Sequence, residues 1–267
     1  MKELFLILKE QVNNLNLIFS LSFSEIKSKY FMHYLGFTWQ IISPLIQILI
    51  YWFVFGLGFR GGSNVGEYPY FIWLIVGLIP WFFINPTMTK GSNSINLRLS
   101  LITKLKFPMS IIPTITIISN SFNFIIMLGI LIIILHVYGI NPGIYYLQLP
   151  YYLICMYVFL YAFTLLFSTL TTIVRDIQAL LQTTMKMLFY ITPILWEINN
   201  IPNKYKPIVQ LNPINYIING FRDTFLYQNW FTHDLKYTLY FWFLTLTMLY
   251  IGSIIHLKHK KNFADYL

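Results

Sequence analysis

The sequence predicts an all-α membrane protein, and three observations lead to that prediction. Hydrophobic residues make up 57% of the 267 positions, whereas only 10% are charged. A soluble domain carries about a quarter charged residues, so this chain has too few to cover a water-facing surface. Apolar runs of roughly 20 residues, the length that crosses a bilayer as a helix, also recur along the chain. We therefore expect one transmembrane domain over residues 1–267, located in the plasma membrane.

Residues 1–30 precede the first long apolar run and predict an amphipathic interface helix. Apolar side chains recur there at steps of three and four residues, which places them on one face of a helix. These residues are Leu4, Leu8, Val12, Leu15, Phe19, Phe23 and Ile26. Nearby lysines suit lipid headgroups, so we expect the apolar stripe to lie in the membrane interface. The alternative is a helix packed on a soluble partner.

Six transmembrane helices are expected after the interface helix, five of them within residues 35–196. Their approximate ranges are 35–59, 68–89, 110–139, 150–174, 177–196 and 236–257. Prolines inside several of these ranges are acceptable, because neighbouring helices can rescue the backbone groups that a proline frees. Most Lys and Arg residues outside the spans fall on the side of the amino terminus, and basic loops stay in the cytoplasm. Both termini, including the tail 258–267, are therefore expected to be cytoplasmic.

The sequence Val174-Arg175-Asp176 interrupts an apolar region that is too long for one crossing and long enough for two. We expect Arg175 and Asp176 to form the cytoplasmic turn between the fourth and fifth spans. A cation is favourable at the carboxyl end of the fourth helix, and a carboxylate can cap the amino end of the fifth. The alternative, an Arg-Asp ion pair buried within one bent helix, costs more.

The basic segment 90–110 is unusually apolar for a cytoplasmic loop. Leucines at helical spacing predict a short helix over 93–105, capped by Asn93 or Ser94 and ended by Pro108. Alternating apolar residues in the same segment leave a strand open, and a solvated linker is a third reading. We favour a helix that docks on another protein, because a short linker rarely carries so many apolar side chains.

The outer segment 197–235 contains three prolines yet remains rich in aromatic and aliphatic residues. It is neither a clean span nor an ordinary polar loop. Short re-entrant helices packed on protein fit this composition. A break at Asn212 precedes a second short helix, which includes Arg222 and Asp223.

The residue types that carry enzymatic chemistry do not cluster in the sequence, so enzymatic activity of this chain is left uncertain. The histidines are scattered, the single Cys155 lies in an apolar run, and no G-x-x-x-x-G-K-[ST] motif is found. We expect no catalytic site, cofactor or metal in the chain itself, and ATP hydrolysis, if required, on a separate subunit. The net charge of +9 reflects basic loops at the membrane, and no nucleic-acid partner is expected.

The order of these elements resembles an ABC-2 type exporter permease, also called the type V exporter fold. Short sequence segments resemble those of the wall teichoic acid exporter permeases of Gram-positive bacteria in particular. They run through nearly the whole chain and include "WLIVGLIPWFFIN", "KFPMSIIPT", "VRDIQALLQ", "FYITPILW" and "LNPINYIINGFRD". Permeases that export O-antigen or capsular polysaccharide share the "NP…FRD" and "RD" elements, so the resemblance identifies the family more firmly than the substrate.

The resemblance implies a homodimeric permease joined to two ATP-binding subunits, which would bind ATP and Mg²⁺. The complex would move undecaprenyl-linked wall teichoic acid across the cytoplasmic membrane, with membrane lipids around it. The implied coupling residues are Asn93, Ser94, Leu97, Arg98, Leu101 and Lys104. The alternatives are export of O-antigen, capsular polysaccharide, a drug or a peptide. A membrane-embedded, lipid-linked sugar transferase is the alternative from a different class.

The resemblance also suggests roles for three smaller groups. The candidates for the substrate path are Tyr51, Trp52, Phe189 and Tyr190, although belts at the membrane interface explain many aromatic residues. Lys27 and Lys29 would attract the pyrophosphate link of the lipid carrier, with ordinary cytoplasmic flanking charge as the alternative. Arg222 and Asp223 would belong to an extracellular gate that controls exit.

Overall fold

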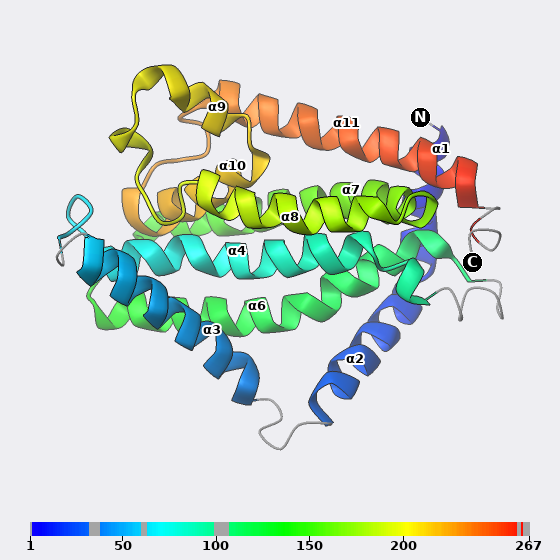
Figure 1. Cartoon of the computed structure of the whole chain (residues 1–267), viewed down its shortest axis with the longest axis horizontal. Helices are drawn as coiled ribbons and strands as arrows, with labels where there is room; N and C mark the ends of the chain where they lie inside the picture. The colour runs from blue at the N-terminus through cyan, green and yellow to red at the C-terminus, as the bar shows by residue number, and fades with distance from the viewer. Residues whose placement is uncertain (1, 32–37, 60–62, 99–106, 261–262, 264–267) are drawn as a thin grey trace.

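The computed structural model describes residues 2–31, 38–59, 63–98, 107–260 and 263. Its regular structure is helical apart from one isolated bridge between Val65 and Tyr68. Five helices run side by side (Figure 1): α4 (Tyr70–Ser92), α6 (Ile112–Val137), α7 (Leu149–Ile173), α8 (Asp176–Ile191) and α11 (Leu235–His259). α1 and the end of α11 lie at the same end of this bundle, which we call the inner end. The opposite end is called the outer end.

Within the described residues, five helical segments are long and apolar enough to cross a membrane. They are Ile41–Gly58, Tyr70–Ser92, Met109–Val137, Gly143–Ile173 and Leu235–His259. Each corresponds to a span expected from the sequence. The first is composed of α3 (Thr38–Tyr51) and a π-helical continuation over Trp52–Phe59, with Pro44 inside α3.

The fifth expected span is shorter than the sequence analysis predicted. α8 ends at Ile191, and its 16 residues give a length of about 24 Å, less than the roughly 30 Å of a hydrocarbon core. The cause is Pro193, because a residue before proline avoids the helical region. Thr192 accordingly has extended backbone angles of φ −70° and ψ 134°. The expected range 177–196 is therefore wrong at its carboxyl end.

The amino-terminal segment forms two helices, α1 (Lys2–Asn13) and α2 (Leu15–Phe31), where one was expected. α1 crosses the inner end of the bundle, and α2 slants away along α6 (Figure 1). Ile7 and Ile18 face the protein and are buried. Most of the predicted apolar stripe is exposed instead, including Val12 and Phe23 at 66% and 69%. An exposed apolar stripe beside a membrane bundle is the arrangement expected of an interface helix.

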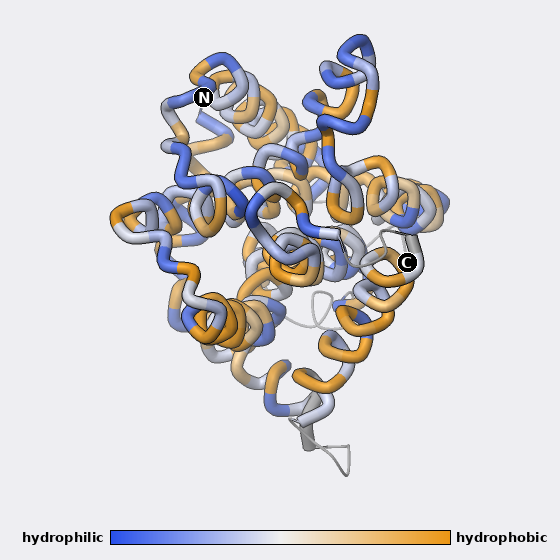
Figure 2. Tube along the Cα trace, turned by 90° about the vertical axis from the view of Figure 1, so that its left-hand side faces the viewer, coloured by the Kyte–Doolittle hydropathy of each residue, from blue (hydrophilic) through white to orange (hydrophobic). Residues whose placement is uncertain are grey.

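Hydrophobicity alone does not distinguish the centre of the bundle from its periphery. The first and second spans have similar mean hydropathies of 1.9 and 1.7, yet 11% and 78% of their residues are buried. α4 is enclosed by α6, α7, α8 and the outer helix α10 (Pro213–Arg222). α3 slants off the bundle and leaves apolar side chains such as Trp39 and Leu49 exposed. Viewed end-on, hydrophobic residues follow the helices on the outside of the bundle as well as inside it (Figure 2).

The outer segment contains short helices, as the sequence predicts. α9 (Lys206–Gln210) is followed by α10 and by a π-helical turn over Asp223–Tyr227. α10 begins at the expected break, because the Asn212 side chain accepts a hydrogen bond from the Ile214 N–H at 3.0 Å. α10 packs against α4, α7 and α11 and is largely buried.

Candidate functional site

The segment predicted to couple to another protein begins where α4 ends. Asn93 is the carboxyl-terminal cap of α4, because its N–H donates to the carbonyl oxygens of Lys90 and Gly91. It is therefore not the amino-terminal cap of a new helix. A single 3-10 turn follows over Asn96–Arg98. Ser94 is fully buried, whereas Leu97 is 68% exposed. The expected residues Leu101 and Lys104 lie outside the described residues, so the predicted helix over 93–105 is described only at its start.

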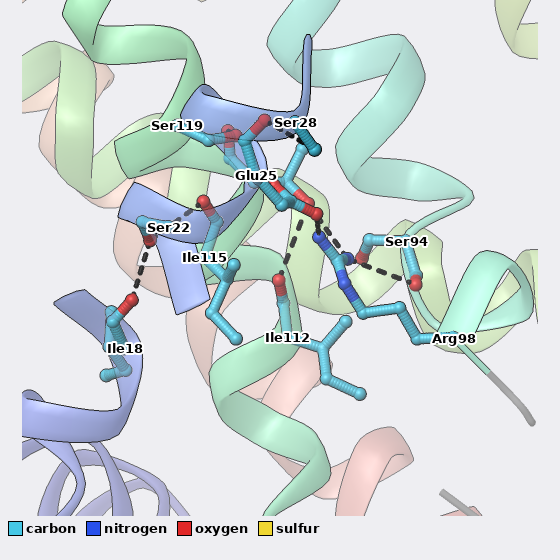
Figure 3. A network of polar contacts seen from close by, with 10 residues as sticks. Ile18, Ser22, Glu25, Ser28, Ser94, Arg98, Ile112, Ile115 and Ser119 are labelled. Atoms are coloured by element: carbon cyan, nitrogen blue, oxygen red, sulfur yellow. Dashed lines mark hydrogen bonds and ion pairs between the residues drawn. The ribbon is translucent and has the colours of Figure 1, made fainter. Parts of the chain in front are cut away.

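Arg98 joins this segment to the interface helix. Its guanidinium forms an ion pair with Glu25 of α2, and it also donates to Thr116 Oγ1 of α6 at 3.2 Å (Figure 3). The side chains of Arg98 and Glu25 are 15% and 31% exposed. On the same side of α2, Ser22 Oγ donates to the carbonyl oxygens of Ile18 and Ile115. Three elements therefore meet at one partly exposed ion pair.

A second polar connection fastens α1 to the inner end. Glu10 accepts a hydrogen bond from Ser110 Oγ at 2.5 Å and forms an ion pair with Lys260 at 2.6 Å. Gln11 Nε2 donates to the Ser110 carbonyl oxygen at 2.8 Å and to the Tyr161 hydroxyl at 2.9 Å. α1 is thus tied to the start of α6, to α7 and to the end of α11.

The two lysines expected to attract a pyrophosphate lie on α2. Lys27 is exposed on this helix. The backbone of Lys29 is helical, but its side chain lies outside the described residues. Their role stays a prediction.

The aromatic candidates for the substrate path lie close together near the outer end. Phe189 of α8 is at the centre, with ring centroids 5.2 Å from Tyr51 and 5.1 Å from Tyr190. Phe189 is buried, whereas Tyr190 is 63% exposed. Trp52 instead packs its ring edge-on to Phe71, at 5.9 Å. Three of the four predicted side chains therefore form one cluster between α3 and α8.

Arg222 is the most enclosed charged residue described, with 2% of its side chain exposed. Its Nη1 and Nη2 donate to the carbonyl oxygens of Pro193 and Ile194, at 2.6 and 3.0 Å. The guanidinium lies 3.5 Å from the centre of the Trp73 ring, which favours a cation through its negative face. Burial lowers the pKa of Arg222 to about 10, so it remains charged at neutral pH. Arg222 therefore holds the segment after α8 against α4 and α10.

Gly77 of α4 leaves room for this guanidinium, because glycine has no side chain. A Cβ atom on Gly77 of α4 would lie 2.7 Å from Arg222 Nη2. A helix with any larger residue at this position would have to displace Arg222 from its two carbonyl partners. Gly77 is therefore part of the same arrangement, and the sequence analysis did not single it out.

Asp223 borders two outer crevices of about 220 and 200 Å³, and Arg222 also lines the first of them. Its carboxylate accepts a hydrogen bond from Asn229 at 3.4 Å. Burial raises the pKa of Asp223 to about 6, although Asn229, His233 and Arg222 act in the opposite direction. Arg222 and Asp223, adjacent in sequence, thus have different partners: Arg222 is held by two carbonyl oxygens and an aromatic ring, whereas Asp223 is largely buried beside both crevices.

A turn lies between α7 and α8 at the predicted position, while its place in the cytoplasm stays a prediction. α7 ends at Ile173 and α8 begins at Asp176, and both Arg175 and Asp176 are exposed at the inner end. The predicted capping bond differs, because no side chain caps this end of α8. The carboxylate still lies in the first helical turn, where the helix dipole favours it.

The sequence analysis missed the acidic partners at the inner end, Glu10 and Glu25. A signal was available, since the chain holds only nine acidic residues and these two lie in a segment otherwise rich in lysine. A carboxylate retained in a basic flank indicates a specific cationic partner. Its identity, Arg98 or Lys260, depends on the fold.

Comparison with known proteins gives a consistent result. Residues 16–226 match the family described as ABC-2 type transporter. Two O-antigen export system permease proteins of Klebsiella pneumoniae are 29% and 30% identical to the chain over 244 residues, which cover 91% of it and 92% of each relative. An O-antigen export system permease protein of Myxococcus xanthus is 25% identical over 251 residues, covering 93% of the chain and 94% of the relative.

Proposed function

The chain belongs to the ABC-2 type transporter family, and on that premise we propose that it is the permease subunit of an ATP-driven exporter of a lipid-linked polysaccharide. The observation that carries the proposal is the similarity to O-antigen export permeases along more than nine-tenths of the chain. The family match itself runs from residue 16 to residue 226, that is, from α2 to the outer segment. The proposal therefore concerns the whole chain as one transmembrane domain.

The proposed topology has six crossings, with both termini in the cytoplasm. The five long apolar helices support a protein that crosses the membrane several times. α8 supplies the remaining crossing in this proposal, the fifth along the chain: it returns the chain from the inner end to the outer end beside α4 and α7 (Figure 1). Because α8 is short, the residues from Thr192 onward would complete the crossing as a turn with bends rather than as a helix, and Arg222 of α10 binds two of their carbonyl oxygens. The outer segment is then a re-entrant element packed on protein, where irregular backbone is tolerated.

Two copies of the chain and two ATP-binding subunits form the proposed complex. ABC-2 permeases work with ATP-binding subunits, and this sequence has no phosphate-binding motif of its own. The exposed apolar faces of α3 and α8, which include Leu49 and Met187, supply a surface for a second copy. ATP and Mg²⁺ belong to the partner subunits, which would dock on the segment from Asn93 to Lys104.

A transport path follows from these positions. Nucleotide-driven movement of the ATP-binding subunits would push on the segment before Arg98 and, through Glu25, on the interface helix α2. The cluster of Tyr51, Phe189 and Tyr190 would offer aromatic faces and hydroxyl groups to sugar rings. Asp223 would contact the polymer at the outer crevices, while Arg222 would keep the surrounding walls in place. The lipid tail could remain in the bilayer throughout.

O-antigen-like polysaccharide is the better supported substrate, because the relatives carry that description. Wall teichoic acid, which the local sequence strings favour, is the narrower proposal. Both polymers share a lipid carrier and repeated hydroxyl groups, so the general mechanism does not depend on the choice between them.

Substrate-stimulated ATP hydrolysis tests the proposal. The permease and its ATP-binding subunit would be reconstituted together in lipid vesicles and given lipid-linked O-antigen, lipid-linked teichoic acid or a hydrophobic drug. We expect a lipid-linked polymer to stimulate hydrolysis and the drug to leave it at the basal rate. Stimulation by the drug, with none by either polymer, would refute polysaccharide export.

A further inference from the structure

A hollow lined by both polar and apolar side chains opens between α4 and α6 near the inner end of the bundle. Its volume is about 150 Å³, several times the roughly 30 Å³ that a water molecule occupies in the liquid. Along α4 it extends from Lys90 to Ile79, a rise of about 16 Å along a helix. Ile18 of α2 packs against Ile111, just before α6, and against Ile115 of α6, one turn before the residues that line the hollow. The hollow therefore lies next to the interface helix α2, between two membrane-spanning helices.

The lining changes in character from the mouth inward. Lys90, in the last turn of α4, is exposed at the mouth. Ser119 and Asn123 follow on one face of α6, and Phe83 and Phe124 stack at a centroid distance of 4.8 Å further along. From the mouth inward, the lining thus begins with a cation, continues with hydroxyl and amide groups, and ends with aromatic rings. This order matches a ligand that has a charged end and a less polar continuation.

Two of these polar groups have unused hydrogen-bonding capacity. The side-chain oxygen of Asn123 is buried and has no hydrogen-bond partner among the described residues. Its neighbour Asn120 is occupied, since its amide donates to Thr87 Oγ1 at 3.2 Å. No described carboxylate pairs with Lys90. A buried polar atom without a partner is costly, which indicates that something else satisfies it.

The free groups specify the chemistry of that ligand. Lys90 offers donors and a positive charge, which a phosphate accepts as a charge-assisted interaction. The Asn123 side chain offers an amide acceptor, which a hydroxyl group can satisfy. A phosphate alone satisfies only the lysine, and a neutral sugar alone leaves the charge unpaired. A sugar attached through phosphate satisfies both residues.

We propose that the hollow between α4 and α6 binds the phosphate–sugar junction of a lipid-linked substrate from the inner leaflet, with Lys90 on the phosphate and Asn123 on a sugar hydroxyl. This inference rests on the proposed function and adds a binding site to it. It places the first recognition step on Lys90 rather than on Lys27 and Lys29. The lipid tail stays in the bilayer beside α6, and the hollow is too small to admit the polymer itself.

Equilibrium binding to the permease complex in lipid nanodiscs tests this site. The probes are a polyprenyl diphosphate carrying one sugar, the same polyprenol without phosphate, and inorganic pyrophosphate as a competitor. We expect Lys90→Gln to weaken binding of the sugar-bearing probe about tenfold, Lys90→Arg to restore most of it, and Asn123→Leu to weaken it several-fold. Lys186→Gln, which removes an exposed lysine of α8, is the matched control and should bind as the wild type does.

The possible results of this experiment distinguish a failure of the binding site from a failure of the proposed function. Unchanged binding in Lys90→Gln overturns the site, even if the complex exports polysaccharide normally. Competition by inorganic pyrophosphate at the probe's own concentration also overturns it, because the site would then take a free anion. Lysine-dependent binding in a complex that exports no polymer supports the site while rejecting the proposed function.

Discussion

The two ends of the bundle each use an arginine, but they use it in different ways. At the outer end, Arg222 is 2% exposed and donates to two neutral carbonyl oxygens while it covers Trp73. At the inner end, Arg98 is paired with the carboxylate of Glu25, and both side chains are partly exposed. A buried cation with fixed backbone partners is costly to disturb, whereas an exposed ion pair exchanges readily with water.

We therefore expect the connection at the outer end to be permanent and the connection at the inner end to form and break. The outer end fastens α10 to the segment after α8, so the walls around Asp223 keep their shape. The inner end joins the carboxyl end of α4 to α2 through an ion pair. We propose that this pair transmits force between the two elements yet allows them to separate during a transport cycle. Four experiments test this difference between the two ends of the bundle.

Replacement of the outer arginine should have the largest effect. Arg222→Met removes the donors of two buried carbonyl oxygens, and we expect a loss of about 3–5 kcal/mol in the free energy of unfolding. Thermal unfolding of the purified permease in detergent measures the change. Arg175→Met, at the exposed turn, is the control and should stay within about 0.5 kcal/mol of the wild type. Equal losses in the two variants would contradict a special role for Arg222.

Crowding the guanidinium should have the next largest effect. In Gly77→Ala the new methyl group would meet Arg222 Nη2 at 2.7 Å and displace it from its partners, at a cost of about 2 kcal/mol. The control is Gly129→Ala on α6, where a Cβ meets nothing within 4 Å and the change should be neutral or stabilising. The same unfolding assay compares the two. A Gly77→Ala protein as stable as Gly129→Ala would show that the outer connection is loose.

The outer carboxylate should give a smaller, pH-dependent effect. Because burial raises the pKa of Asp223 to about 6, above the usual value of an unfolded aspartate, its contribution to stability is full at low pH and is lost as pH rises through 6. Between pH 4.5 and pH 7.5 we expect Asp223→Asn to remove a pH-dependent change of about 1–2 kcal/mol. Comparison of unfolding temperatures across this range measures it. Identical pH profiles for wild type and variant would contradict the buried environment of Asp223.

The inner ion pair should affect stability least and coupling most. Glu25→Gln is expected to cost less than about 1 kcal/mol in unfolding free energy. The amount of polymer exported per ATP hydrolysed should nevertheless fall several-fold, because α2 no longer follows Arg98. The charge-swapped double variant Glu25→Arg with Arg98→Glu should recover much of this ratio. Glu3→Gln on α1 serves as the control, and a loss of coupling equal to that of Glu25→Gln would remove the specific role of the pair.

The sequence predicted the helical membrane fold because hydropathy and length are local properties. Five of the six expected spans match long apolar helices, and the turn at Arg175 lies where the change of charge predicted it. The early end of α8 could also have been read from the sequence, since Thr192 precedes a proline. The predicted range followed the length of the apolar run and ignored the proline.

Contacts between distant residues could not be predicted in the same way. The charge of Arg222 was visible, but its two carbonyl partners come from a segment 28 and 29 positions earlier in the chain. Glu25 and Arg98 are 73 positions apart, and no local pattern pairs them. Hydropathy also failed to distinguish the enclosed α4 from the peripheral α3, because lipid and protein interior favour the same side chains.

The central claim is that this chain moves a lipid-linked polysaccharide across a membrane only when a partner subunit hydrolyses ATP. Its most direct test uses sealed vesicles that contain the permease and the ATP-binding subunit, with the polymer supplied on one side. Accessibility of the polymer to a glycosidase on the other side reports transport. We predict transport with the active partner and none with a hydrolysis-deficient partner or with the permease alone. Equal transport in all three preparations would contradict the account.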